Sequence, residues 1–347
     1  MFDKPAFAGH ESVHHFFDAK TGLRAIVAIH STARGPAAGG CRMWNYATSE
    51  DALVDALRLS EGMSNKNAIA DLPLGGGKSV IWGNAKTDKT PDLFRAFGRA
   101  IETLNGKYWT AEDVGVSVHD MALVAEETKY VAGLPSGKAA SGDPSPITAK
   151  GVFLGIKATA LRAFGTDDLN GKHIAVQGVG HVGGYVCSYL AKAGAKLTIT
   201  DVNAEALATV ASSTGAKVVA PDEIYDVDAD IFSPNALGAI INPTTLPRLK
   251  VKVIAGAANN QLATAGMGEK VLEKGILYAP DYVINGGGII NVAAEISGTY
   301  DPAWVEAKVQ RLIQTLGEVL DQAQSEKRAT NRIADEIARQ RIAAARA

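Results

Sequence analysis

A glycine-rich segment at residues 178–183 carries the clearest chemical signal in this sequence. Its residues, GVGHVG, match the pattern G-x-G-x-x-G, with the apolar segment 173–177 before it and a helical pattern after it. Gly178 permits a tight turn, Gly180 lets backbone approach a pyrophosphate, and Gly183 lets helix and strand touch. The helix N-terminus supplies N–H groups for phosphate. The segment predicts a dinucleotide site, with a methyltransferase or a ligand-free glycine turn as the alternatives.

A carboxylate occupies the position at which dinucleotide-binding sites contact the adenosine ribose. The second apolar segment, residues 196–200, ends at Asp201, 23 residues after Gly178. An acid at this point accepts hydrogen bonds from the adenosine ribose and repels a 2′-phosphate. Asp201 therefore favours NAD over NADP.

Three charged residues in the first third of the chain stand in or beside segments of small residues: Lys66, Lys78 after three glycines, and Asp113. A lysine can bind a small carboxylate, and a lysine held in an apolar setting can act as a general base. Taken singly, each residue is more simply a surface lysine or a helix cap. A phosphate-binding P-loop ending in Lys78 is excluded, because its first glycine is replaced by Leu72.

The elements that must position these residues alternate along the chain. Segments 14–18 and 23–30 predict a hairpin, a helix begins near residue 49, and helices cover 92–105 and 148–164. Further strands are predicted at 173–177, 196–200, 230–232, 251–255 and 276–278. This alternation favours an α/β fold with a parallel sheet. Apolar residues at helical spacing from Val305 to Leu320 predict a long helix with a core-facing side.

Length and composition limit the class of protein. The 347 residues suggest two domains, and the Pro/Gly/Ser-rich stretch 133–147 is the predicted hinge. A net charge of −2 gives no overall attraction to nucleic acid or membrane. The first residues lack a secretion signal, no apolar run is long enough to span a bilayer, and two cysteines exclude a disulfide scaffold. We expect a cytoplasmic protein without a metal.

Several long motifs together resemble the glutamate/leucine/phenylalanine/valine dehydrogenase family over nearly the whole chain, with leucine dehydrogenases nearest. They are GPAAGG (35–40), LGGGKSVI (74–81), YWTAEDVG (108–115), SGDPSPITAKGV (141–152), VIAGAANNQL (253–262) and ILYAPDYVINGGGIINVAAE (276–295). The resemblance implies reversible oxidative deamination of an L-amino acid, giving the 2-oxo acid, ammonium and NADH.

It also implies an architecture. A substrate-binding and oligomerisation domain covers residues 1–135 and a Rossmann NAD-binding domain covers 136–324, with a cleft between them. A C-terminal helix of about 325–347 packs back on the first domain. The chain is expected to form a homo-oligomer.

The family's roles carry over to matching positions. Lys66 and the backbone of Gly39 and Gly40 would hold the substrate carboxylate, Lys78 would activate water, and Asp113 would move protons at the amine and carbinolamine. Asn260 would help to bind substrate. The expected NAD site consists of Thr148, Gly178, Val179, Gly180, His181, Val182, Gly183, Asp201, Val202, Ala236, Asn259 and Asn285.

The substrate side chain is expected to be apolar. Glutamate-specific relatives have a lysine at the position of Ala38, and a buried acidic side chain without a partner costs several kcal/mol, which excludes glutamate. The expected pocket residues are Ala38, Met63, Ala111, Ile289 and Val292. Ala111 and residues 280–295 favour leucine.

Other features keep alternatives open. Ala38 and Trp109 are typical of phenylalanine-specific relatives, so an aromatic or broad specificity is the alternative. A non-catalytic NAD-binding regulator is the alternative of another class, disfavoured because Lys66, Lys78 and Asp113 are all present. Asn235 stands where the family has cysteine, which leaves the fit around the nicotinamide open.

Overall fold

A computed structural model of the protein describes residues 1–134, 143–298 and 300–346. It forms two compact units, so the expected two-domain α/β organisation is confirmed. The first unit contains Met1–Asp143, Ile289–Val305 and Ala338–Ala347, and the second contains Pro144–Gly288 and Glu306–Ile337. This division differs from the expected one, which assigned residues 289–305 to the NAD-binding domain. Most of the predicted hinge, 133–147, lies outside the described residues.

The first unit is built on a five-stranded mixed sheet in the order β1-β2-β4-β3-β5. β1 (Ser12–Asp18) and β2 (Leu23–Ser31) form the predicted antiparallel hairpin. β4 (Gly75–Trp82) pairs antiparallel with β2 and parallel with β3 (Ala37–Trp44), which also pairs parallel with β5 (Tyr108–Glu112). β3 therefore lies between β4 and β5.

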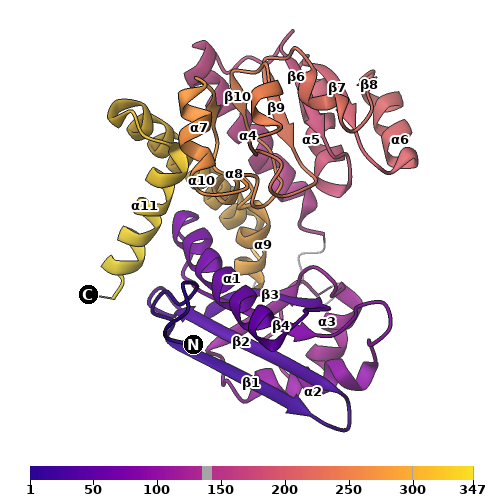
Figure 1. Ribbon diagram of the computed structural model, residues 1–347, viewed down its shortest axis with the longest axis vertical. Coiled ribbons are helices and arrows are strands. Elements are labelled where there is room, and N and C mark those ends of the chain that lie inside the picture. The colour runs from indigo at the N-terminus through magenta and orange to yellow at the C-terminus, as the bar shows by residue number, and fades with distance from the viewer. Residues whose placement is uncertain (135–142, 299, 347) are drawn as a thin grey trace. The chain divides into compact units, whose positions relative to one another are not determined.

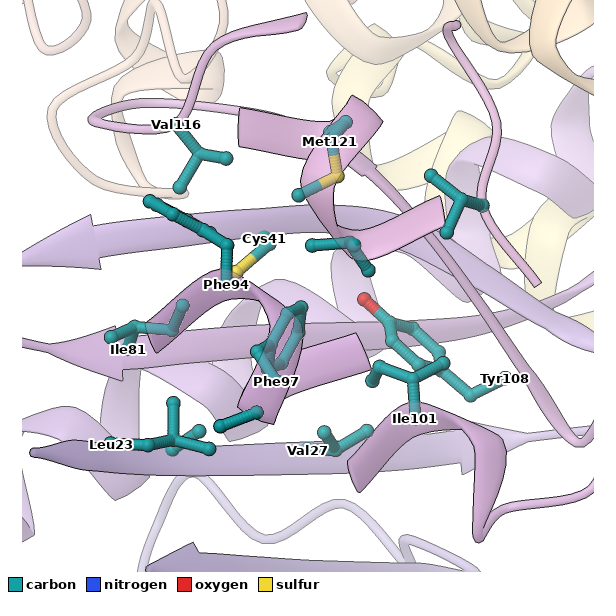
Figure 2. Packing of buried hydrophobic residues seen from close by; sticks show 14 of the residues in the cluster. Leu23, Val27, Cys41, Ile81, Phe94, Phe97, Ile101, Tyr108, Val116 and Met121 are labelled. Carbon is teal, nitrogen blue, oxygen red and sulfur yellow. The ribbon is translucent and has the colours of Figure 1, made fainter. Parts of the chain in front are cut away.

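Helices cover both faces of this sheet. On one face, α1 (Ser49–Ile69) packs Ala56 and Leu57 against Ala28 and Val80. Its N-terminus is closed by a capping box of Thr48 and Asp51, which satisfies backbone N–H groups there. On the other face, α2 (Pro91–Glu102) and α3 (Val118–Ala125) enclose a larger core. Figure 2 shows Phe97 and Ile101 beside β2, the strand that carries Leu23 and Val27, with Tyr108 of β5 close to Ile101.

The second unit is built on a six-stranded parallel sheet (Figure 1), in the order β11-β10-β9-β6-β7-β8. The strands are β6 (His173–Gln177), β7 (Lys196–Thr200), β8 (Lys217–Val218), β9 (Ile231–Pro234), β10 (Val253–Ile254) and β11 (Leu277–Tyr278). The strand order reverses between β6 and β9, the point at which doubly wound sheets bind their ligands. The predicted Rossmann-type domain is thus confirmed.

Helices precede, connect and follow these strands along the chain. They are α4 (Ser145–Phe164), α5 (His181–Lys192), α6 (Ala204–Thr214), α7 (Met267–Glu273) and α8 (Asp281–Ile284), with short 3-10 helices at Glu223–Asp226 and Leu246–Arg248. α4 ends at Gly165, whose φ of 75° closes the helix in the left-handed conformation that glycine adopts readily.

Three helices complete the chain: α9 (Gly287–Ile296), α10 (Pro302–Glu326) and α11 (Thr330–Ala344). Val309, Leu312, Leu316 and Leu320 of α10 are buried, which confirms the predicted core-facing side. The last turns of α11 belong to the first unit, where Arg341 donates to the carbonyls of Ala68 and Ile69 at 3.2 and 2.7 Å. Among the described residues, no helix combines the length and apolar character needed to cross a membrane.

Candidate functional site

An ion pair between a buried lysine and a partly buried aspartate joins two of the predicted catalytic residues. Lys78 lies on β4 with 6% of its surface exposed, and its Nζ donates to Asp113 Oδ2 at 2.5 Å. Asp113 directly follows β5, so the pair reaches across β3. Gly40 of β3 lies beneath it: a Cβ there would be 2.8 Å from Asp113 Cβ, closer than real Cβ contacts. Glycine at this position therefore leaves room for the pair.

The pair has its own charged surroundings. Burial acts to raise the pKa of Asp113, but the charge and hydrogen bond of Lys78, together with Arg42, outweigh burial and lower that pKa below its ordinary value. Asp113 is thus an ionised carboxylate at neutral pH. Arg42 Nε lies 3.5 Å from Asp113 Oδ2, and Arg42 Nη1 donates to Asp55 Oδ2 at 3.0 Å.

The predicted carboxylate-binding residues lie on the neighbouring elements. Lys66 is in the last turn of α1 and half-buried, and Gly39 and Gly40 lie in β3. A Cβ at Gly39 would be 1.9 Å from the carbonyl oxygen of Gly77 and 3.1 Å from Met63 Cγ. Only glycine fits this contact, and it leaves the backbone of β3 without side-chain cover at Gly39 and Gly40. Tyr108, which the sequence analysis did not select, donates to the Gly39 carbonyl at 2.6 Å and fixes this backbone.

The five predicted pocket residues all belong to the first unit. Ala38 pairs with Trp109 and Ala111 with Gly40 across β3 and β5, and Met63 lies on α1. Ile289 and Val292 lie three residues apart on α9, which places them on one side of that helix. The Gly133 backbone N–H donates to Glu295 Oε2 at 2.5 Å, which ties α9 to the segment after β5.

The glycine-rich loop has the geometry that its sequence predicts. Gly178 has a φ of +90°, and a Cβ there would be 2.6 Å from Ala236 Cβ. A Cβ at Gly183 would be 2.1 Å from the Gly178 carbonyl oxygen, so α5 packs directly on the loop. Beside Gly180, by contrast, nothing lies within 4 Å of a Cβ position, and no side chain caps the α5 N-terminus. This open helix end fits a phosphate group.

Asp201 holds the loop from the end of β7. Its Oδ2 accepts from the Val179 N–H at 2.7 Å, and its Oδ1 accepts from the Asn203 N–H at 2.8 Å. The next residue, Val202, is 90% exposed and offers an apolar surface. Asp201 thus hydrogen-bonds to the glycine-rich loop, which is predicted to hold the pyrophosphate. His181 and Val182 lie in the first turn of α5.

The remaining predicted cofactor residues follow β9, β10 and α8 or lie on α4. Asn285 Nδ2 donates to the Ala257 carbonyl at 3.0 Å and to Asn259 Oδ1 at 2.7 Å. Its Oδ1 is buried and has no hydrogen-bond partner within the described ranges, so an acceptor is left over for a ligand donor. Thr148, on α4, lies beside Gly288, where a Cβ would be 3.1 Å from Thr148 Oγ1. These features fit a bound dinucleotide.

Asn235, which stands where the family has cysteine, forms hydrogen bonds with two segments of the second unit. Its Nδ2 donates to the Ser233 carbonyl at 2.9 Å, and its Oδ1 accepts from the Ala257 N–H at 2.9 Å. The side chain thus joins the end of β9 to the segment after β10, a bond that a thiol makes only weakly.

Asn260 belongs to the second unit, whereas the other predicted substrate residues belong to the first. It is exposed, with a φ of +51°, and its carbonyl accepts from the Ala239 N–H at 2.6 Å. Over residues 1–134, 143–298 and 300–346, no three His, Cys, Asp or Glu side chains gather as metal ligands would.

Known proteins match this chain along most of its length. Residues 10–130 match the family described as Glu/Leu/Phe/Val dehydrogenase, dimerisation domain, and residues 197–347 match Glutamate/Leucine/Phenylalanine/Valine dehydrogenase. A leucine dehydrogenase of Bacillus cereus is 51% identical over 334 residues, 96% of this chain and 91% of the relative. A phenylalanine dehydrogenase of Bacillus thermotolerans is 45% identical over 99% of this chain and 91% of its own.

A solved structure agrees with these matches. The L-tryptophan dehydrogenase of Nostoc punctiforme has a TM-score of 0.86 and 43% identity, covering 98% of this chain and 97% of the other.

Proposed function

The chain belongs to the Glu/Leu/Phe/Val dehydrogenase family of amino acid dehydrogenases, and we propose that it catalyses the reversible, NAD-dependent oxidative deamination of apolar L-amino acids, leucine above others. The observation that carries this proposal is the partly buried Lys78–Asp113 pair beside the uncovered backbone of Gly39 and Gly40. A regulator that only binds a nucleotide has no use for such a pair.

The first unit supplies the groups that bind and activate substrate. Lys66 and the β3 backbone hold the α-carboxylate, because a cation and N–H groups are the partners that a carboxylate accepts from. Lys78 passes its proton to Asp113 and then removes a proton from the water that attacks the iminium carbon. Asp113 accepts and returns protons at the amine and the carbinolamine. The 2.5 Å contact between Lys78 and Asp113 lets the two side chains exchange a proton without rearrangement.

The second unit supplies the cofactor site. The α5 N-terminus and Gly180 would hold the pyrophosphate, and Asp201 would hold the adenosine ribose. Asn285 Oδ1 would accept a hydrogen bond from the nicotinamide side of the cofactor. When bound, NAD⁺ accepts the hydride from Cα of the amino acid. Asp201 favours NAD over NADP, because its charge repels a 2′-phosphate.

Leucine is favoured by the apolar pocket residues and by similarity. The leucine dehydrogenase of Bacillus cereus is 51% identical to this chain, and the phenylalanine dehydrogenase of Bacillus thermotolerans is 45% identical. Ala38 leaves more space than a larger side chain, and this supports aromatic or broad specificity as the alternative. Pockets of this kind separate side chains that differ by one methylene by only ~1–3 kcal/mol. The region matched as a dimerisation domain supports a homo-oligomer.

The test is NADH formation with a panel of L-amino acids at alkaline pH, followed at 340 nm. We expect turnover with Leu, Ile and Val, lower kcat/KM for Phe and Trp, and none for Glu. A higher kcat/KM for Phe or Trp would support the alternative. No absorbance change with any of them would refute the proposed enzyme.

A further inference from the structure

Arg42 links the Lys78–Asp113 pair to a second carboxylate. It lies on β3 two residues beyond Gly40 and therefore on the same side of the sheet. Its Nε is 3.5 Å from Asp113 Oδ2, and its Nη1 donates to Asp55 Oδ2 of α1 at 3.0 Å. Tyr46 donates to the same Asp55 oxygen at 2.7 Å. Arg42 Nε is buried, and in the described part of the chain it has no hydrogen-bond partner.

The charges around Arg42 balance in pairs. Of its neighbours, the Cys41 thiol is neutral, because burial raises its pKa to about 12. The Tyr46 hydroxyl is neutral too, because burial and Asp55 raise its pKa. Two cations, Arg42 and Lys78, and two carboxylates, Asp55 and Asp113, remain. Buried charges are tolerated when they are paired in this way, and removal of one leaves its partner uncompensated.

We propose that Arg42 is a positioning residue: it holds the Asp113 carboxylate in place for Lys78 and, with Asp55 and Tyr46 behind it, sets the protonation state of the pair. The buried Nε, 3.5 Å from Asp113 Oδ2, is the group through which the Arg42 charge acts on Asp113. The proposal rests on the proposed function, in which Asp113 transfers protons. It assigns to Arg42 no contact with substrate.

The first test does not depend on activity. Asp113 is observed by carboxyl ¹³C NMR in protein labelled at aspartate, with Asp113→Asn to assign its signal. In the wild type we expect Asp113 to stay ionised to the lowest pH at which the protein is folded. In Arg42→Met the Asp113 carboxyl should begin to protonate while the protein is still folded, because loss of a cation makes the pair hold its proton more tightly. An unchanged signal in a folded Arg42→Met variant would overturn the proposal.

The second test uses the pH profile of kcat/KM. We expect the acidic limb to move up by about 1 pH unit in Arg42→Met and down in Asp55→Asn, since these changes remove opposite charges. kcat at neutral pH should fall ~10–100-fold in Arg42→Met with KM little changed, because Asp113 is misplaced while the carboxylate contacts remain. A purely structural role would lower activity in both variants without opposite shifts, and that result would contradict the proposal.

Arg34→Met is the matched control. Arg34 is a partly buried arginine of the same unit, paired with Asp71 at 2.7 Å, and should leave the profile in place. Arg42→Lys keeps the cation and should keep the wild-type limb, and Arg42→Gln, which also removes the charge, replaces Arg42→Met if the latter does not fold. An inactive wild type would refute the proposed function alone, because the NMR result tests Arg42 separately.

Discussion

At the scale of single residues, Lys78 depends on its setting more than on its identity. A lysine after three glycines could equally lie on the surface, but here it is buried and bound to Asp113 at 2.5 Å. Burial restricts its partners to the ionised carboxylate and to whatever small molecule reaches the pair. This restriction is what a general base requires.

Replacement of Lys78 by alanine should lower kcat by several orders of magnitude, because no other group on β4 can take the proton from water. NADH binding, measured by fluorescence titration, should stay close to wild type, since the cofactor residues belong to the other unit. Near wild-type turnover of Lys78→Ala would remove Lys78 from the base role.

Replacement of Asp201 tests the cofactor preference. Asp201→Asn keeps an oxygen that accepts from the Val179 N–H but loses the charge, whereas Asp201→Ala loses both. We expect both variants to use NADP better relative to NAD than the wild type, with Asp201→Ala also the less stable protein. The measurement is the ratio of kcat/KM for NAD and NADP, and an unchanged ratio in both variants would mean that Asp201 does not select the cofactor.

At the scale of elements, β3 organises the first unit because glycine replaces side chains at Gly39 and Gly40. The strands on either side carry Lys78 and precede Asp113, and parallel neighbours lie about 4.8 Å apart. A Cβ at Gly40 would be 2.7 Å from the Glu112 carbonyl oxygen and 2.8 Å from Asp113 Cβ. Glycine at this position therefore lets Asp113 lie close to β3.

The N-terminal segment is attached to β2 and α1 by two buried histidines. The rings of His10 and His30 lie 4.9 Å apart, and His30 Nδ1 is 2.7 Å from Ser64 Oγ of α1. Burial, assisted by His10 and Arg346, lowers the pKa of His30 to about 4, although the Ala8 carbonyl opposes the shift. Burial lowers the pKa of His10 as well. Both rings are neutral in the folded protein at pH 7.

These histidines predict an acid-sensitive fold. Between the unfolded pKa of ~6.5 and the folded value of about 4, the unfolded chain binds more protons, so the free energy of unfolding falls as pH decreases. His30 alone should account for a loss of about 3 kcal/mol over this range. Urea unfolding between pH 7 and 4.5 measures it. His30→Leu should flatten the pH dependence, while His15→Leu, at an exposed position, should not; equal slopes in all three proteins would contradict this account.

At the scale of the whole molecule, the first unit is assembled from three separate stretches of chain. Ile289–Val305 and Ala338–Ala347 join Met1–Asp143, so two of the expected pocket residues come from a segment more than 140 residues beyond β5. Arg341 helps to hold the last stretch, because its two hydrogen bonds satisfy carbonyls at the C-terminal end of α1.

Arg341→Met should therefore lower the free energy of unfolding by about 1–3 kcal/mol, since two carbonyls lose their donor. The exposed Arg339 on the same helix is the matched control, and Arg339→Met should change stability by less than about 0.5 kcal/mol. Denaturant unfolding of the two variants gives the comparison. Equal effects would show that the carbonyl contacts of Arg341 do not stabilise the unit.

The sequence by itself determined the local features of this protein. The loop at Gly178, the acid at Asp201 and the hairpin of β1 and β2 depend on neighbouring residues, whose types dictate backbone angles and turn geometry. The turn at Gly178 and the hairpin are found where they were predicted, and Asp201 directly follows β7 as expected, while its role toward the ribose stays a prediction. The motifs around Lys66, Lys78 and Asp113 likewise sufficed to indicate a family, because each motif is a continuous stretch.

Only the tertiary structure decided which of these stretches meet. That Lys78 contacts Asp113 follows from β3 lying between β4 and β5, and strand order is set by packing over the whole unit rather than by local pattern. Arg42, Tyr108 and Asn235 gained their roles in the same way, since each acts on a group far away in sequence. The position of a polar residue in a strand indicates the face of the sheet on which it lies, but not the residue that it contacts. The partner depends on long-range contacts that the pattern of one segment does not encode.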